Sequence, residues 1–144
     1  MTPETFKTLF ITGVSRGIGL ATANPFLDNG YEVIGTSTSG KSPLENEKFT
    51  VLKLDLSSPE SIKSVAENII SQGRRFDIFI NNAGSVFDKR GEAVIEIESL
   101  RKTLEVNLIG TIDMTERLLP SINNGGHILN PTFNLQMQPV DKNF

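Results

Sequence analysis

Short apolar runs alternate with amphipathic stretches along most of this 144-residue chain. The apolar runs have the length of strands and fall at residues 7–12, 31–36, 49–54, 76–80 and 127–130. Helix-type spacing and helix-end signals predict helices at residues 18–29, 57–71 and 98–119. Strands that alternate with helices are joined by right-handed crossovers, so the pattern predicts an α/β fold in which a doubly wound parallel sheet lies between two helical layers.

The first predicted helix contains a proline. Pro25 has no N–H, and its ring would clash with the carbonyl group of Ala21 in a helix interior. We therefore expect a kink or a break there, with Asn24 capping a short second piece. Asn29 and Gly30 then predict the end of this helix.

The second predicted helix carries a start signal and one apolar face. Ser57 and Glu60 have the spacing of a capping box. Four apolar positions recur at three- and four-residue spacing and are expected to pack on the sheet: Ile62, Val65, Ile69 and Ile70. Residues 123–126 predict a turn before the last strand.

Composition narrows the class of protein. With 38% hydrophobic and 22% charged residues, the chain reads as one globular domain. A net charge of −3, spread over both signs, gives no reason to expect a nucleic-acid or acidic-membrane partner. The absence of cysteine excludes disulfides, zinc–thiolate sites and cysteine nucleophiles, and no other metal site is identified. Residues 1–7 show no secretion signal or membrane span, so a cytoplasmic location is expected.

A glycine-rich turn stands between the first strand and the first helix. Gly13, Gly17 and Gly19 follow the apolar run 8–11 and precede the helical run 20–23. Glycine can turn tightly and lets a phosphate approach the main chain, while the helix start offers unpaired N–H groups and the positive end of its dipole. The turn therefore predicts a dinucleotide site in a Rossmann-type fold.

Three further motifs, in order, accompany this turn. Asp55 and Leu56 follow the third strand, residues 81–84 (Asn-Asn-Ala-Gly) follow the fourth, and Asn107 lies in the last predicted helix. Together they resemble the short-chain dehydrogenase/reductase family over residues 8–130. Arg16 stands where the extended subfamily wants glycine, so the common subgroup, similar to the ketoacyl-carrier-protein reductases, fits better.

The resemblance implies an NAD(P)-binding domain over residues 1–130 and an oxidoreductase that moves a hydride between nicotinamide and a carbonyl or secondary alcohol. Asp55 would accept a hydrogen bond from the adenine amino group, and Asn107 would belong to the catalytic tetrad. The implied coenzyme-binding residues are Gly13, Ser15, Arg16, Gly17, Ile18, Gly19, Thr36, Ser37, Asp55, Leu56, Asn81, Asn82, Ala83 and Gly84.

Each of these motifs also has a purely structural interpretation. The glycine turn and residues 82–84 would then serve close packing, and Asp55 would be the polar end of a strand. Asn107 shares a helix face with apolar Leu100 and Leu104, so its amide needs hydrogen-bond partners whether or not it takes part in catalysis.

Coenzyme choice is read at the end of the second strand. NAD-specific sites usually place a carboxylate there for the ribose 2′-hydroxyl group, whereas this chain has Thr36, Ser37, Thr38 and Ser39. Arg16 and Lys41 offer positive charge to a 2′-phosphate. We therefore expect NADP(H) to be preferred, with NAD(H) possible.

The chain departs from the family at the proton-transfer residues. No Tyr-x-x-x-Lys occurs, Tyr31 is the single tyrosine, and Phe133 stands closest to the place of the family's serine. A hydride step needs an acid or base within hydrogen-bond reach. We expect this chain alone to be inactive. A catalytically inactive nucleotide-binding module or truncated relative is the alternative, and a Rossmann-type protein of other chemistry, such as a methyltransferase, is a third.

The tail 131–144 breaks the alternation of strands and helices. By resemblance, the family continues with two more strands and two more helices, so a chain ending here would leave a sheet edge and a helix face bare, and a homo-oligomer is expected. Phe133, Leu135 and Met137 alternate with polar residues. This period of two predicts a strand that covers the sheet edge, in its own chain or in a partner's.

Overall fold

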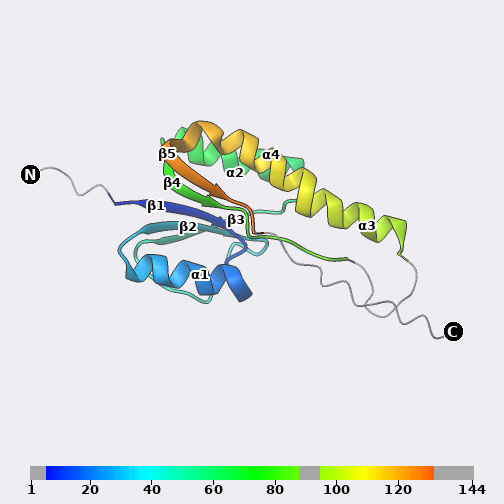
Figure 1. Ribbon diagram of the computed structural model, residues 1–144, viewed down its shortest axis with the longest axis horizontal. Coiled ribbons are helices and arrows are strands. Elements are labelled where there is room, and N and C mark those ends of the chain that lie inside the picture. The colour runs from blue at the N-terminus through cyan, green and yellow to red at the C-terminus, as the bar shows by residue number, and fades with distance from the viewer. Residues whose placement is uncertain (1–5, 88–94, 132–144) are drawn as a thin grey trace, which may run out of the picture.

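The predicted parallel sheet is present. The computed structural model describes residues 6–87 and 95–131, and within them five strands pair in the order β3-β2-β1-β4-β5, all parallel (Figure 1). The strands are β1 (Thr8–Thr12), β2 (Glu32–Ser37), β3 (Phe49–Lys53), β4 (Phe76–Ile80) and β5 (Ile122–Leu129). The fold is therefore the expected Rossmann-type α/β architecture.

Helices cover both faces of the sheet. Helix α1 (Gly17–Asp28) lies on one face, and α2 (Pro59–Ser71) and α4 (Thr111–Leu118) lie on the other (Figure 1). The predicted helix 98–119 is helical throughout, but it is divided into α3 (Ile97–Leu104), a π-helical turn η1 (Glu105–Gly110) and α4, and it ends in the 3₁₀ turn η2 (Leu119–Ser121). The sequence pattern did not indicate the π-helical turn.

A phenylalanine cluster forms the centre of the core. Phe10, Phe76 and Phe79 are fully buried, and the Phe10 ring centroid lies 5.1 Å from that of Phe76 and 5.0 Å from that of Phe79. Ile62 and Ile69 of α2 pack into the same cluster, as predicted for one face of that helix. Ile70 does not, since it is 48% exposed.

The predicted break at Pro25 is absent. Helix α1 runs without a break through Pro25, and Asn24 caps no second piece. Pro25 and Ala21 lie on the exposed side of α1, where water can bond the carbonyl group that Pro25 leaves unpaired, while buried Ala23 and Leu27 hold the helix against the sheet.

The start of α2 also differs from the prediction. Its cap is Ser58, whose Oγ accepts a hydrogen bond from the Ser61 N–H at 3.2 Å, with Pro59 as the first helical residue. Ser57 instead donates its hydroxyl hydrogen to Asp55 at 2.6 Å. The Ser57 N–H donates to the same Asp55 oxygen at 2.9 Å, so Ser57 belongs to a short turn closed by Asp55, and the helix begins after it.

The fifth strand begins earlier than predicted. Residues 123–126 belong to β5 and form an irregularity, because Phe76 pairs with Ile122 while Ile78 pairs with His127. Strand β5 lies at one end of the sheet, and Leu100, Leu104, Leu108 and Ile112 on the α3–α4 segment are 39–51% exposed. The strand predicted in the tail lies outside the described residues. Among those described, no helix has the length and apolarity to span a membrane.

The π-helical turn packs unusually close to the end of β3. Gly110 is buried there, and a Cβ at this position would overlap the Leu56 carbonyl oxygen, which belongs to the main chain and has little room to move. The small residue therefore lets α4 approach the loop that follows β3.

We predict that Gly110→Ala destabilises the protein by about 1–3 kcal/mol, because the added methyl group overpacks this contact. The direction of the change in unfolding free energy is informative, since Gly→Ala inside a helix ordinarily stabilises a protein by up to about 1 kcal/mol. Urea unfolding followed by circular dichroism measures the effect, with Glu116→Ala on the exposed side of α4 as the control. A Gly110→Ala protein as stable as the wild type would contradict the close packing.

Candidate functional site

The site lies where the direction of the sheet winding reverses. Strands β2 and β3 follow on one side of β1, while β4 and β5 lie on the other. The glycine turn leaves the carboxyl end of β1, and residues 81–84 leave the carboxyl end of β4, its neighbour. In doubly wound sheets, this crevice is where ligands bind.

Close backbone contacts shape the glycine turn. Gly13 has a φ of +79°, and the N–H groups of Gly13 and Val14 both donate to the Thr36 carbonyl oxygen at 2.9 Å. A Cβ on Gly13 would come within 3.0 Å of the Ala83 Cα, and one on Gly19 would overlap the Gly13 carbonyl oxygen. Gly19 therefore packs the helix against the turn and does not line the pocket.

The first turn of α1 opens toward the pocket. Arg16 precedes the helix in an extended conformation, and no side chain caps the first N–H groups. Gly17 has a φ of +58°, and the space where its Cβ would project contains no protein atom within 4 Å. These main-chain N–H groups and the helix dipole are available to an anionic ligand.

Asn82 braces the turn from the neighbouring strand. Its Nδ2 donates to the carbonyl oxygens of Thr12 at 3.0 Å and Gly13 at 3.1 Å, and the Ala83 N–H donates to the Thr12 hydroxyl oxygen at 2.9 Å. The ends of β1 and β4 are thereby fixed relative to each other.

Asn81 points into a different network. Its Nδ2 donates to the Thr115 hydroxyl oxygen at 3.0 Å and to Asn130 Oδ1 at 2.7 Å, and its N–H donates to the Leu129 carbonyl oxygen at 2.9 Å. Asn81 joins β4, β5 and α4 and does not line the pocket.

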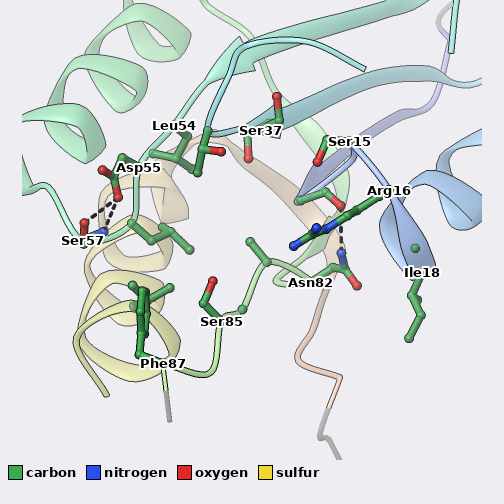
Figure 2. Close-up of a pocket in the computed structure, with 18 residues that line it drawn as sticks. Ser15, Arg16, Ile18, Ser37, Leu54, Asp55, Ser57, Asn82, Ser85 and Phe87 are labelled. Atoms are coloured by element: carbon green, nitrogen blue, oxygen red, sulfur yellow. Dashed lines mark hydrogen bonds between the residues drawn. The ribbon is translucent and has the colours of Figure 1, made fainter. Parts of the chain in front are cut away.

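Asp55 supplies negative charge at one end of the pocket (Figure 2). Its Oδ1 accepts hydrogen bonds from the Ser57 hydroxyl group at 2.6 Å and the Ser57 N–H at 2.9 Å. The hydroxyl bond first, and then the backbone bond, hold the pKa of this carboxyl below its usual value. Because the pKa is lowered, Asp55 stays ionised at neutral pH and loses its charge only in acid.

The end of β2 carries hydroxyl groups and no carboxylate. Thr36, Ser37 and Thr38 line the pocket, and the Ser37 hydroxyl group accepts from the Lys41 N–H at 2.9 Å and donates to the Lys41 carbonyl oxygen at 2.7 Å. Arg16 is the one cation among the described lining residues, and Figure 2 shows its side chain pointing into the pocket. Lys41 does not line it.

Asn107 lies in η1, behind the loop that follows β4. Its Oδ1 accepts from the Ser85 N–H and its Nδ2 donates to the Ser85 carbonyl oxygen, both at 2.7 Å. Asn107 has hydrogen-bond partners, as expected, but it and its neighbours Leu100 and Leu104 are exposed, so the bonds hold the loop and do not compensate for burial of the amide. It contacts the pocket only through this loop.

The lining residues enclose a pocket of about 490 Å³. Twelve of the fifteen residues singled out in the sequence lie around it, and the three outside are Gly19, Asn81 and Asn107. Sequence reasoning did not assign six lining residues: Thr38, Leu54, Ser57, Ser85, Phe87 and Val106. Leu54, Ser57, Ser85 and Val106 flank residues of the motifs, and Thr38 lies in the hydroxyl run at the end of the second strand, whereas no pattern in the sequence indicated Phe87.

Three comparisons bear on this arrangement. The 3-ketodihydrosphingosine reductase of Bacteroides thetaiotaomicron is 34% identical over 127 residues, covering 86% of this chain and 46% of the relative. A short-chain dehydrogenase/reductase structure from Burkholderia multivorans with bound NADP has 27% identity and a TM-score of 0.75, with 89% of this chain and 59% of that chain covered. A Leptospira borgpetersenii short chain dehydrogenase with bound NAD⁺ shares the fold at 24% identity and a TM-score of 0.74, covering 87% of this chain and 50% of that chain.

The sequence also matches a model of a whole protein family. The short chain dehydrogenase family matches residues 7–141, which is nearly the entire sequence. The chain spans less than half the length of the curated relative described above. By this match and by the motifs that surround its pocket, the chain belongs to the short chain dehydrogenase family.

Proposed function

We propose that this chain is the coenzyme-binding part of an NADP(H)-dependent oxidoreductase that interconverts a carbonyl compound and a secondary alcohol. One observation carries the proposal: the glycine turn, the uncapped start of α1 and Asp55 surround a single pocket at the winding reversal. A nucleotide is complementary to this set, because it joins an anionic diphosphate to a base with an exocyclic amino group.

The polarity of the pocket suggests where each part of the coenzyme would bind. The diphosphate would lie against the main chain at Gly17 and Ile18, where unpaired N–H groups are available. The adenine amino group would donate to the ionised Asp55. Ala83 carries only a methyl group and Gly84 has no side chain, which would leave room for the ribose.

The preference for NADP(H) rests on charge at the end of β2. A 2′-phosphate placed beside Thr36, Ser37 and Thr38 meets hydroxyl groups and no carboxylate there. Arg16 can form a charge-assisted hydrogen bond with that phosphate. A 2′-hydroxyl group gains little from the same residues, so NADH would bind more weakly.

The reaction needs a proton partner beside the nicotinamide. Asn107 would be the contribution of this chain to the catalytic tetrad, and the 144 residues contain no Tyr-x-x-x-Lys. The absence of this tyrosine–lysine pair favours a second candidate function, a nucleotide-binding module that does no chemistry.

A homo-oligomer is also part of the proposal. It is supported by the exposed leucines on α3 and η1, and sedimentation equilibrium would check it.

We predict that Gly17→Val weakens NADPH binding by more than about tenfold, because the side chain fills the space in which the diphosphate meets the main chain. Gly30→Val is a matched control: Gly30 has a φ of +82° and also has no protein atom near its Cβ position, but it lies outside the pocket. Both changes should cost about 1–2 kcal/mol of stability. Titration of intrinsic NADPH fluorescence measures the affinities, and equal binding by the two variants would refute the proposed site.

We predict that NADPH binds more tightly than NADH and that Arg16→Ala removes the difference. Loss of a hydrogen bond to a charged phosphate should lower NADPH affinity by about ten- to a hundredfold and leave NADH affinity nearly unchanged. Lys63→Ala, an exposed cation of α2, is the control. Tighter binding of NADH by the wild type would reverse the coenzyme assignment.

We predict that the 144-residue chain binds NADPH without oxidising it when a panel of ketones is supplied, because it lacks a tyrosine–lysine pair to move the proton. Absorbance at the nicotinamide band follows turnover, and binding is measured in parallel. Turnover would show that another group of this chain supplies the proton.

Reading the coding DNA past the Asn130 codon in all frames separates the two candidate functions. A downstream Tyr-x-x-x-Lys favours the oxidoreductase, and its absence favours the nucleotide-binding module.

A further inference from the structure

The loop after β4 is held to the helical segment by side chains. Asn107 binds both backbone groups of Ser85, and the Phe87 N–H donates to the Thr103 hydroxyl oxygen at 3.2 Å. Three backbone groups of residues 85–87 are therefore bonded to two side chains one helical turn apart. Ser85 and Phe87 both line the pocket.

Thr103 is oriented to accept this bond. Its hydroxyl group donates to the Ser99 carbonyl oxygen at 2.9 Å, one turn back in α3. With its hydrogen committed to Ser99, the oxygen presents only lone pairs to the Phe87 N–H. A valine at this position would keep the shape of the side chain and lose the acceptor.

Phe87 forms an apolar part of the pocket wall. Figure 2 shows it beside the yellow helical segment, on the same side of the view as Asp55 and Ser57 and away from Arg16. Leu54, Leu56 and Val106 add further apolar surface to the wall. An apolar wall next to a carboxylate suits a purine, which has a flat face and a polar edge.

We propose that Thr103 is a positioning residue of the coenzyme pocket: through the Phe87 N–H it holds the Phe87 ring in the wall at the Asp55 end, where the purine of the coenzyme binds. This inference rests on the proposed function. Phe87 is 44% exposed, so more than half of its surface packs on the described residues and the rest does not. The hydrogen bond to Thr103 fixes the backbone from which the ring projects.

The test compares Thr103→Val with Thr103→Ser, which retains the hydroxyl group. Thr111→Val is the matched control, because the Thr111 hydroxyl group donates to the Val106 carbonyl oxygen in the same helical segment and is bonded to none of residues 85–87. Calorimetry measures the affinity for adenosine 2′,5′-bisphosphate, which carries the purine but no nicotinamide. Hydrogen exchange reports on the Phe87 amide.

The expected result is that Thr103→Val binds adenosine 2′,5′-bisphosphate about three- to tenfold more weakly, the range of one neutral hydrogen bond. Thr103→Ser and Thr111→Val should bind as the wild type does, and the Phe87 amide should exchange faster only in Thr103→Val. Phe87→Ala should lose purine affinity as well, which tests the wall without altering the helix.

Two outcomes would overturn the inference while leaving the proposed function intact. The first is a wild type that binds the bisphosphate together with a Thr103→Val protein that binds it equally well. The second is an equal loss of affinity in Thr103→Val and Thr111→Val, which would assign the effect to the helix as a whole. A wild type that binds neither the bisphosphate nor NADPH would overturn the proposed function itself, and the inference with it.

Discussion

The contact between the glycine turn and the end of β4 is the constraint on which the site depends. Gly13 must lie against Ala83, and Asn82 must reach back to the carbonyl oxygens of Thr12 and Gly13. A side chain at Gly13 or Gly19 would push these backbones apart. Because the same contact orients the start of α1 and places residues 83 and 84, one close approach of main chain positions two neighbouring parts of the pocket wall.

Periodicity and turn chemistry were sufficient to predict the sheet. Strand β4 was located at its observed ends, and β1, β2 and β3 to within one residue, because buried parallel strands are apolar nearly throughout. Competition between neighbouring groups was harder to foresee. Whether Ser57 or Ser58 caps α2 depends on where the Asp55 carboxylate lies, and whether Pro25 breaks α1 depends on which side of the helix faces water.

The pocket was predictable to the extent that short motifs define it. Residues 13–18, 55–56 and 82–84 carry their chemistry in local spacing, and the structure brings them together. Phe87 lines the pocket from a loop that is bonded to Thr103 of α3, a contact between distant residues that no local pattern predicts. The sequence marks Asn107 as a polar residue among leucines. Its two partners are the N–H and carbonyl groups of Ser85, and no sequence pattern predicts a bond to main-chain groups.

The bonds from Asn82 and Ala83 to the glycine turn span about 70 positions of the chain. Such distant segments meet only after β1 and β4 have paired, since closing a long loop carries an entropic cost that local helices do not. The cradle therefore exists only in molecules in which β1 and β4 have paired. A ligand that recognises it can select only molecules in which both halves of the sheet have already joined, and it then opposes their separation by mass action.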